Sequence, residues 1–183
     1  MSYASRIPIR PLSDLEWHAL LPYVLRRSPQ GRQIGDLRAR MNALFRLTAT
    51  DAPWKHADDP GIAAESLARY YRRLTHAGLW ERLLEALHDA GPLHPLRAIE
   101  ALICRAARRA HRLRGLGLLV LARRLGFRRA LNAPPWLLPD PDLSERLLEA
   151  GPPAPEFQKP WLRVLKTLIG RRRIAPSVRR AWV

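Results

Sequence analysis

The sequence is nearly free of cysteine, and this scarcity removes several classes of protein at once. Cys104 is the single cysteine in 183 residues, so the chain has neither an internal disulfide nor a cysteine-based zinc cluster. Cysteine usage of this kind is typical of the reducing cytoplasm. Because no activating base is identifiable beside it, we expect Cys104 to be a small apolar residue on a helix.

Long apolar runs are also missing from the chain. The most hydrophobic stretch, GLGLLVLA at residues 115–122, has eight residues between arginines, whereas a helix that spans a bilayer needs about 20. The first residues, MSYASRIPIRPLSD, lack the apolar segment of a secretion signal. We therefore expect a soluble, cytoplasmic protein without a transmembrane segment.

Acidic residues are scarce relative to basic ones. The chain has 32 Lys and Arg against 16 Asp and Glu, which gives a formal net charge of +16, and 29 of the basic residues are arginine. A field of this sign attracts polyanions, with nucleic acid the commonest and anionic membrane the next. A GC-rich genome also enriches arginine, but that bias does not by itself remove the balancing acids. The composition favours an anionic partner.

Motifs for catalysis and cofactor binding are absent as well. The six histidines lack the close spacing of a metal site, and no glycine-rich loop of the kind that cradles phosphate is present. We therefore expect no enzymatic activity, no cofactor and no bound metal.

Helical periodicity dominates the first 90 residues, and no alternating strand pattern is found there. Ser13 and Glu16 have the spacing of a capping box, so a helix should begin at Asp14, and Pro22 should break it early. A second helix should follow Asp36 and end before the turn-forming DAPW at residues 51–54.

Two further helices are expected before residue 92. The third should run from about Ala63 to His76, with Gly78 as the left-handed residue that follows it. The fourth should end at Gly91 and Pro92. Its predicted inward face consists of Trp80, Leu83, Leu84 and Leu87.

The third predicted helix has two chemically distinct sides. Apolar residues including Leu67, Tyr71 and Leu74 share one side, which predicts a core face. The other side combines guanidinium groups, a phenol that we expect to be exposed, and a hydroxyl, so it offers phosphate ligands and base-edge donors together. This predicted DNA-contacting face consists of Ser66, Arg69, Tyr70, Arg72, Arg73 and His76. The alternative is an ordinary solvated surface on which Glu65 pairs with Arg69.

The second half of the chain differs from the first in charge. Residues 1–92 carry a net charge of +3, whereas residues 93–183 carry +13. This shift predicts two regions: a helical domain at 1–92 and a basic, proline-interrupted helical region at 93–183. The predicted fold class is all-α.

Arginine gathers on one side of an amphipathic helix at the start of the second region, and apolar residues between Leu96 and Leu113 occupy the other side. Gly115 and Gly117 should interrupt this helix, and another should run from 118 to 131. The arginines predicted to contact DNA here are Arg105, Arg108, Arg109 and Arg112.

Prolines then become too dense for long helices. We expect a short helix at 142–150, an amphipathic helix beginning near Trp161, and a basic tail at 171–180.

The order of features from Leu12 to Leu87 resembles the N-terminal helical domain of insertion-element transposases. The matching pieces are LSDLEWHALLP (12–22), GRQIGDLRARMNALFRL (31–47), APWK (52–55) and YYRRLTHAGLWERLLEAL (70–87). Their order and spacing together are specific. The resemblance implies a helix-turn-helix-like module that helps to recognise element ends, with the third helix as the reading helix.

In that family an RNase H-like catalytic domain with three acidic residues follows the helical domain. Here the acids after Asp89 lie in segments without a strand pattern, and Asp140 and Asp142 fit a turn and a helix cap better than metal ligands. We therefore expect a truncated or derived transposase that binds DNA without nuclease or strand-transfer activity.

Three alternatives remain at this point. The chain could be a protein-interaction regulator that forms a homo-oligomer or binds an intact transposase through its apolar faces at 96–113 and 162–169. Its basic second half could bind an anionic membrane surface. It could also be a decaying fragment of a mobile element, truncated or shifted in frame.

Overall fold

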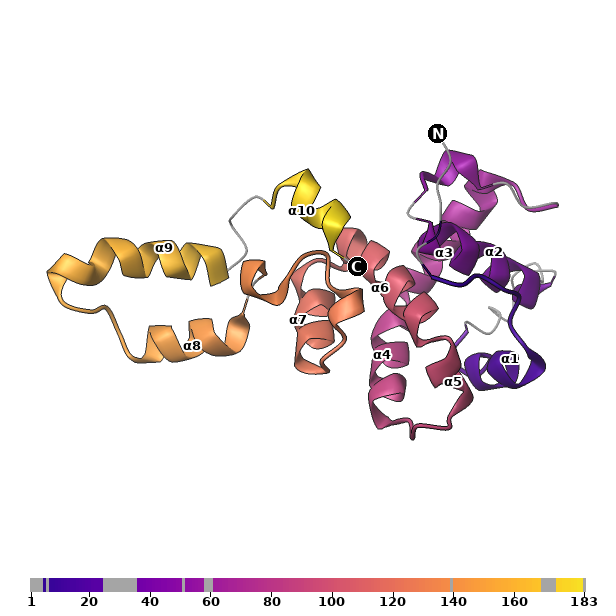
Figure 1. Ribbon diagram of the computed structural model, residues 1–183, viewed down its shortest axis with the longest axis horizontal. Helices are drawn as coiled ribbons and strands as arrows, with labels where there is room; N and C mark the ends of the chain where they lie inside the picture. The colour runs from indigo at the N-terminus through magenta and orange to yellow at the C-terminus, as the bar shows by residue number, and fades with distance from the viewer. Residues whose placement is uncertain are drawn as a thin grey trace.

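The computed structural model describes residues 5, 7–24, 36–50, 52–57, 61–138, 140–168 and 174–182. These residues form an all-α fold, as predicted, and contain no β-strand (Figure 1). The α-helices are α1 (Asp14–Leu20), α2 (Leu37–Ala49), α3 (Ala64–His76), α4 (Leu79–Asp89), α5 (Pro95–Ala98), α6 (Glu100–Arg114), α7 (Leu116–Arg124), α8 (Pro141–Glu149), α9 (Gln158–Leu168) and α10 (Pro176–Ala181). Short 3-10 turns occur at η1 (Trp54–His56), η2 (Arg128–Ala130), η3 (Pro135–Leu137) and η4 (Pro155–Phe157).

Local capping signals fix where the first two helices begin. The Ser13 hydroxyl accepts a hydrogen bond from the Glu16 amide at 3.3 Å, and the Glu16 carboxylate accepts one from the Ser13 amide at 2.8 Å. α1 ends at Leu20, before Pro22. The Asp36 carboxylate accepts from the Ala39 amide at 2.9 Å and so caps α2. Both predicted helix starts are confirmed.

Glu16 links the stability of this region to pH. The residue is 3% exposed, and Arg10 donates hydrogen bonds to both of its carboxylate oxygens. These bonds lower the pKa of Glu16 below its ordinary value of 4.5. Because the folded-state pKa is the lower one, the ion pair contributes its full stability above pH 4.5 and loses it as the pH falls through the folded-state pKa.

Glu16→Gln is therefore expected to flatten the acid side of the stability profile. The wild-type free energy of unfolding should fall more steeply between neutral and acidic pH than that of the variant, because glutamine has no proton to gain. Urea unfolding at a series of pH values measures this difference. Parallel profiles for the two proteins would contradict the role assigned to the Arg10–Glu16 pair.

The turn between α3 and α4 uses a left-handed residue, as predicted. Gly78 has a φ of +73°, a conformation that glycine adopts without strain, and it lets the chain reverse after His76. α4 then places its apolar residues inward and ends before Gly91 and Pro92. All four predicted core residues of α4 have no exposed surface: Trp80, Leu83, Leu84 and Leu87.

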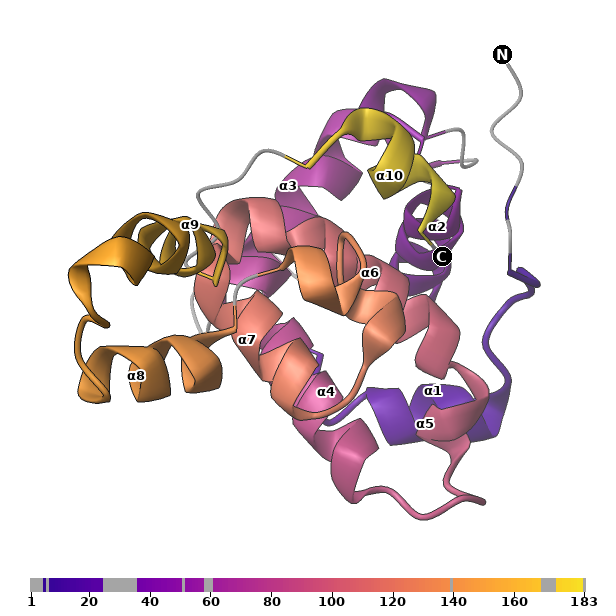
Figure 2. The ribbon, with the colours of Figure 1, turned by 60° about the vertical axis from the view of Figure 1, so that its left-hand side comes forward.

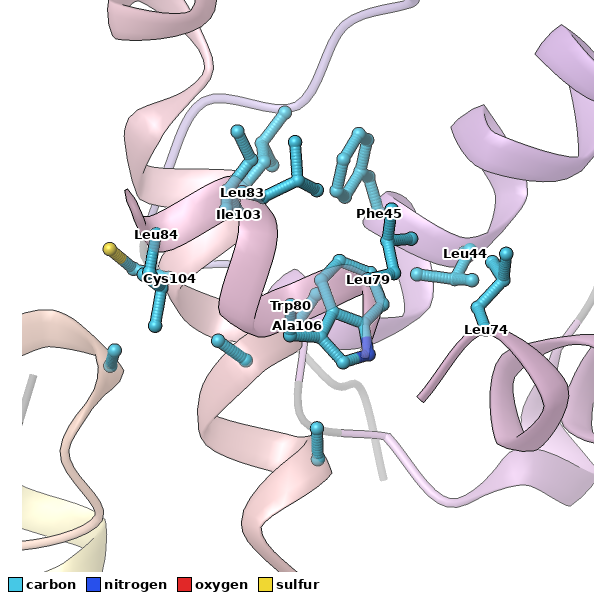
Figure 3. Packing of buried hydrophobic residues seen from close by; sticks show 14 of the residues in the cluster. Leu44, Phe45, Leu74, Leu79, Trp80, Leu83, Leu84, Ile103, Cys104 and Ala106 are labelled. Carbon is cyan, nitrogen blue, oxygen red and sulfur yellow. The ribbon is translucent and has the colours of Figure 1, made fainter. Parts of the chain in front are cut away.

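One core joins the two halves of the chain. α6 packs against α2, α3, α4 and α7. The buried apolar residues form one cluster in space, with members from Leu12 to Leu138. Figure 3 shows Leu83 beside Ile103 and Trp80 beside Ala106, where α4 meets α6. The boundary predicted at residue 92 therefore falls within a continuous core, because Gly91 and Pro92 end α4 but α6 folds back onto it.

Three aromatic rings connect the loop after α2 with α3 and α4. The Trp54 and Tyr71 ring centroids lie 5.0 Å apart, and those of Tyr71 and Trp80 lie 5.6 Å apart. The Tyr71 hydroxyl donates to the Ala106 carbonyl at 2.8 Å, and Trp80 Nε1 donates to the Thr75 hydroxyl at 2.8 Å. These contacts hold one side of α3 in the core and leave the opposite side outward.

The helices of the second half differ in part from the prediction. Gly115 ends α6 as expected, but Gly117 lies inside α7, so its predicted role as an interruption is wrong. The predicted helix over 118–131 is also wrong in its second part. Gly126, with a φ of +79°, reverses the chain after α7, and Phe127 and Leu131 return to the core through η2.

α8 and α9 form an antiparallel hairpin that projects from the body of the fold (Figure 1). Asp140 caps α8 by accepting from the Leu143 amide at 3.1 Å, which confirms the predicted short helix and the capping role. Arg123 bonds to Asp140 at 2.7 Å and Arg124 to Asp142 at 2.5 Å, so two ion pairs join the base of the hairpin to α7. Figure 2 shows α10 returning to lie against the body.

Within the described ranges, no helix is both long enough and apolar enough to cross a membrane.

Candidate nucleic-acid interface

The exposed side of α3 carries most of its predicted DNA-contacting residues in one row. Arg69, Arg72, Arg73 and His76 are all exposed and recur at helical spacing. Among the described residues, Arg69, Arg72 and His76 form no hydrogen bond or ion pair. The alternative pairing of Glu65 with Arg69 is likewise not found in this part of the chain. We call these four residues the α3 row.

Tyr70 lies at the edge of the α3 row but is buried, so its predicted exposure is wrong. The residue is 4% exposed, and its hydroxyl has no hydrogen-bond partner in the described part of the chain. The guanidinium carbons of Arg40 and Arg73 lie 6.0 and 5.5 Å from the ring centroid. Burial raises the pKa of Tyr70, which the two arginines partly offset. The Tyr70 ring therefore packs against the Arg73 guanidinium and is not available to contact DNA.

Arg40 is not among the predicted DNA-contacting residues, although it contacts Ser66 and Tyr70 of α3. It comes from α2, and its Nη1 donates to the half-buried Ser66 hydroxyl at 3.2 Å. Ser66 is thus placed between the α2 arginine and the α3 row. No signal in the sequence reveals this contact, because it depends on how α2 packs across α3.

Two of the four arginines predicted on α6 are inside the protein. Arg105 is 5% exposed and Arg108 is 9% exposed, so neither can contact DNA in this fold. Arg108 Nη1 donates to the carbonyl of Trp182, the residue after α10, at 2.9 Å. The amphipathic pattern predicts that this side of the helix faces solvent, whereas η2 packs against α6 and Trp182 reaches Arg108.

The other two predicted α6 arginines have different surroundings. Arg109 donates to the Ala52 carbonyl at 2.8 Å and stacks over Trp54 at 4.3 Å, so it holds the loop after α2. Arg112 is exposed and forms no hydrogen bond or ion pair within the described residues. Burial raises the pKa of Tyr71, and the nearby positive charge of Arg112 offsets part of this rise. Arg112 therefore adds one exposed guanidinium group near the end of α6.

The 3-10 turn η2 carries two other exposed basic groups. Arg128 and Arg129 on η2 are exposed, and η2 packs against α6. Residues 171–173 of the predicted basic tail lie outside the described residues, as do the side chains of Arg179 and Arg180.

Other predicted features of the sequence have structural roles. The apolar face at 96–113, predicted as a possible partner surface, lies in the chain's own core, where Leu96 and Ile103 have no exposed surface. Cys104 is fully buried, and burial raises the pKa of its thiol to about 12, as expected for an inert core residue. Within the described residues, no group of three or more His, Cys, Asp or Glu is placed to hold a metal ion.

Comparisons of the chain with protein-family models, with curated proteins and with solved structures found no match.

Proposed function

We propose that the chain is a cytoplasmic DNA-binding protein related to the N-terminal domain of insertion-element transposases, and that α3 is the helix that contacts duplex DNA. The observation that carries the proposal is the α3 row, in which three guanidinium groups and an imidazole are exposed together. In a chain of net charge +16, such a row attracts a polyanion.

The geometry of α3 suits a groove. From Arg69 to His76 the row extends along two turns of helix, about 10 Å at a rise of 1.5 Å per residue. The major groove of B-DNA, about 12 Å wide, admits an α-helix, and arginine can bond there to two acceptors of guanine or to the flanking phosphates. The buried side of α3 is fixed by Tyr71 and by the packing of Leu74, so the row is held rigidly before DNA arrives.

Residues beyond α3 would supply affinity more than specificity. Arg112, Arg128 and Arg129 lie on α6 and η2, where they offer long, flexible cations to the DNA backbone. Contacts of this kind release counterions from DNA, so they make binding depend strongly on salt and only weakly on base sequence.

Single alanine substitutions test this assignment. Arg69→Ala, Arg72→Ala and Arg73→Ala should each weaken binding of a fluorescent duplex, by about 5-fold or more if the side chain reaches a base edge. Arg112→Ala should reduce the salt dependence by about one unit of slope, as expected when one phosphate contact is lost.

Two matched variants serve as controls. Arg146→Ala removes an exposed arginine from α8, and Arg109→Ala removes one that is engaged with Trp54 and Ala52. Neither should change the affinity of the folded protein for DNA, although Arg109→Ala should lower the free energy of unfolding. If the three α3 variants bind as tightly as wild type, α3 is not the contacting helix.

A further inference from the structure

The hairpin formed by residues 141–168, which we call the arm, has little packing of its own. α9 packs against α8 and η4, and the arm stands apart from the body in both views (Figures 1 and 2). Its sequence contains nine large apolar residues, yet Leu165 is the only described side chain in the arm that is buried. Two short helices with so small a core gain stability when a partner covers them.

The arm also presents apolar side chains to the outside. Leu148 and Phe157 are 60% and 59% exposed, and Leu162 and Val164 are each 46% exposed. Four large apolar side chains within 17 residues are more than the scattered exposure of a monomer surface. The pattern points to a surface that is covered by another molecule.

The charge of the arm favours a protein partner over DNA. Residues 141–168 contain four acidic and four basic residues, so the arm is neutral in a chain of net charge +16. The two helices differ in sign: residues 141–149 have three acids and one base, whereas residues 158–168 have three bases and no acid. α8 of one chain is thus complementary to α9 of another.

We propose that the arm pairs with the arm of a second copy of this chain. With the two-fold axis along the arm, α8 of each copy lies antiparallel to α9 of the other, and the two arms form a four-helix bundle with alternating directions. Each acidic helix then has a basic helix on either side, and the exposed apolar residues gain a common core.

Sedimentation velocity of the full chain without DNA tests the pairing. Wild type should form a dimer at micromolar concentration. Phe157→Asp and Leu162→Asp should raise the dimer dissociation constant by about 10-fold or more, because each places a charge among the apolar side chains that pairing would cover, Phe157 at the tip of the arm and Leu162 within α9. Leu93→Asp is the matched control, since Leu93 is 98% exposed and lies outside the arm. It should leave the dimer unchanged, and circular dichroism should show that all three variants remain helical.

A charge exchange tests the arrangement of the helices. Glu149 at the end of α8 and Lys159 at the start of α9 are both exposed near the tip of the arm. Glu149→Lys and Lys159→Glu should each weaken the homodimer, and a mixture of the two variants should restore a dimer, because opposite charges again meet across the bundle.

Three results would overturn the proposal: a wild-type chain that stays monomeric at every concentration, dimers that persist unchanged in Phe157→Asp and Leu162→Asp, or charge variants that do not pair when mixed. These results are independent of DNA binding, because the α3 row and the arm share no residue.

Discussion

The triple variant R69A/R72A/R73A is expected to bind duplex DNA about 100-fold more weakly than wild type. Each arginine that reaches a base edge contributes about 1–3 kcal/mol, so the loss of three at the lower limit costs about 3 kcal/mol. The three side chains are exposed, and two of them have no partner among the described residues. The fold should therefore be retained, which circular dichroism and urea unfolding would confirm.

A charge-matched variant separates this effect from a general loss of positive charge. Arg97, Arg114 and Arg124 each form an ion pair, with Glu100, Glu81 and Asp142 respectively. R97A/R114A/R124A removes the same formal charge from positions that already have a carboxylate partner. Its DNA affinity should fall far less than that of the α3 variant. Equal losses in the two triple variants would mean that net charge, and not the α3 row, determines binding.

Trp80→Ala is expected to destabilise the protein by about 3–5 kcal/mol, a large share of the total of about 5–15 kcal/mol for a typical domain. Trp80 has no exposed surface, its ring centroid lies 5.6 Å from that of Tyr71, and its Nε1 donates to the Thr75 hydroxyl of α3. Figure 3 shows Trp80 beside Ala106 of α6. The substitution leaves a cavity between α3, α4 and α6 and removes the hydrogen bond that the Thr75 hydroxyl accepts from Trp80.

Urea unfolding monitored by circular dichroism measures the loss. Trp136→Ala is the control, because Trp136 is 72% exposed and contacts Trp182 only edge-on, with ring centroids 6.3 Å apart. It should cost about 1 kcal/mol or less. A small effect of Trp80→Ala would contradict the assignment of this residue to the centre of the core.

Features that depend on neighbouring residues could be predicted from the sequence. The Ser13 capping box, the Asp36 cap and the left-handed Gly78 are determined within a few residues of chain, and all three are present. The inward face of α4 could also be predicted, since its leucines and Trp80 follow a clear helical period.

Features that depend on which other elements cover a helix could not be predicted from the sequence. Periodicity divides a helix into one apolar and one polar side, but α6 is covered on several sides, so Arg105 and Arg108 are buried on its polar side. Tyr70 is buried because α2 crosses α3 beside it, where Arg40 reaches its ring. Of the candidate site, the α3 row and Arg112 fit the predicted exposed surface. Tyr70, Arg105 and Arg108 are buried, and Arg109 holds the loop after α2.

The measurement that tests the central claim most directly is fluorescence anisotropy of the wild-type chain with random duplex DNA and with a candidate element-end sequence, across a salt series. The proposal predicts tight binding whose logarithm falls steeply and linearly with the logarithm of salt concentration, together with a preference for the element end. Absence of binding at low salt, in a chain of net charge +16, would contradict it.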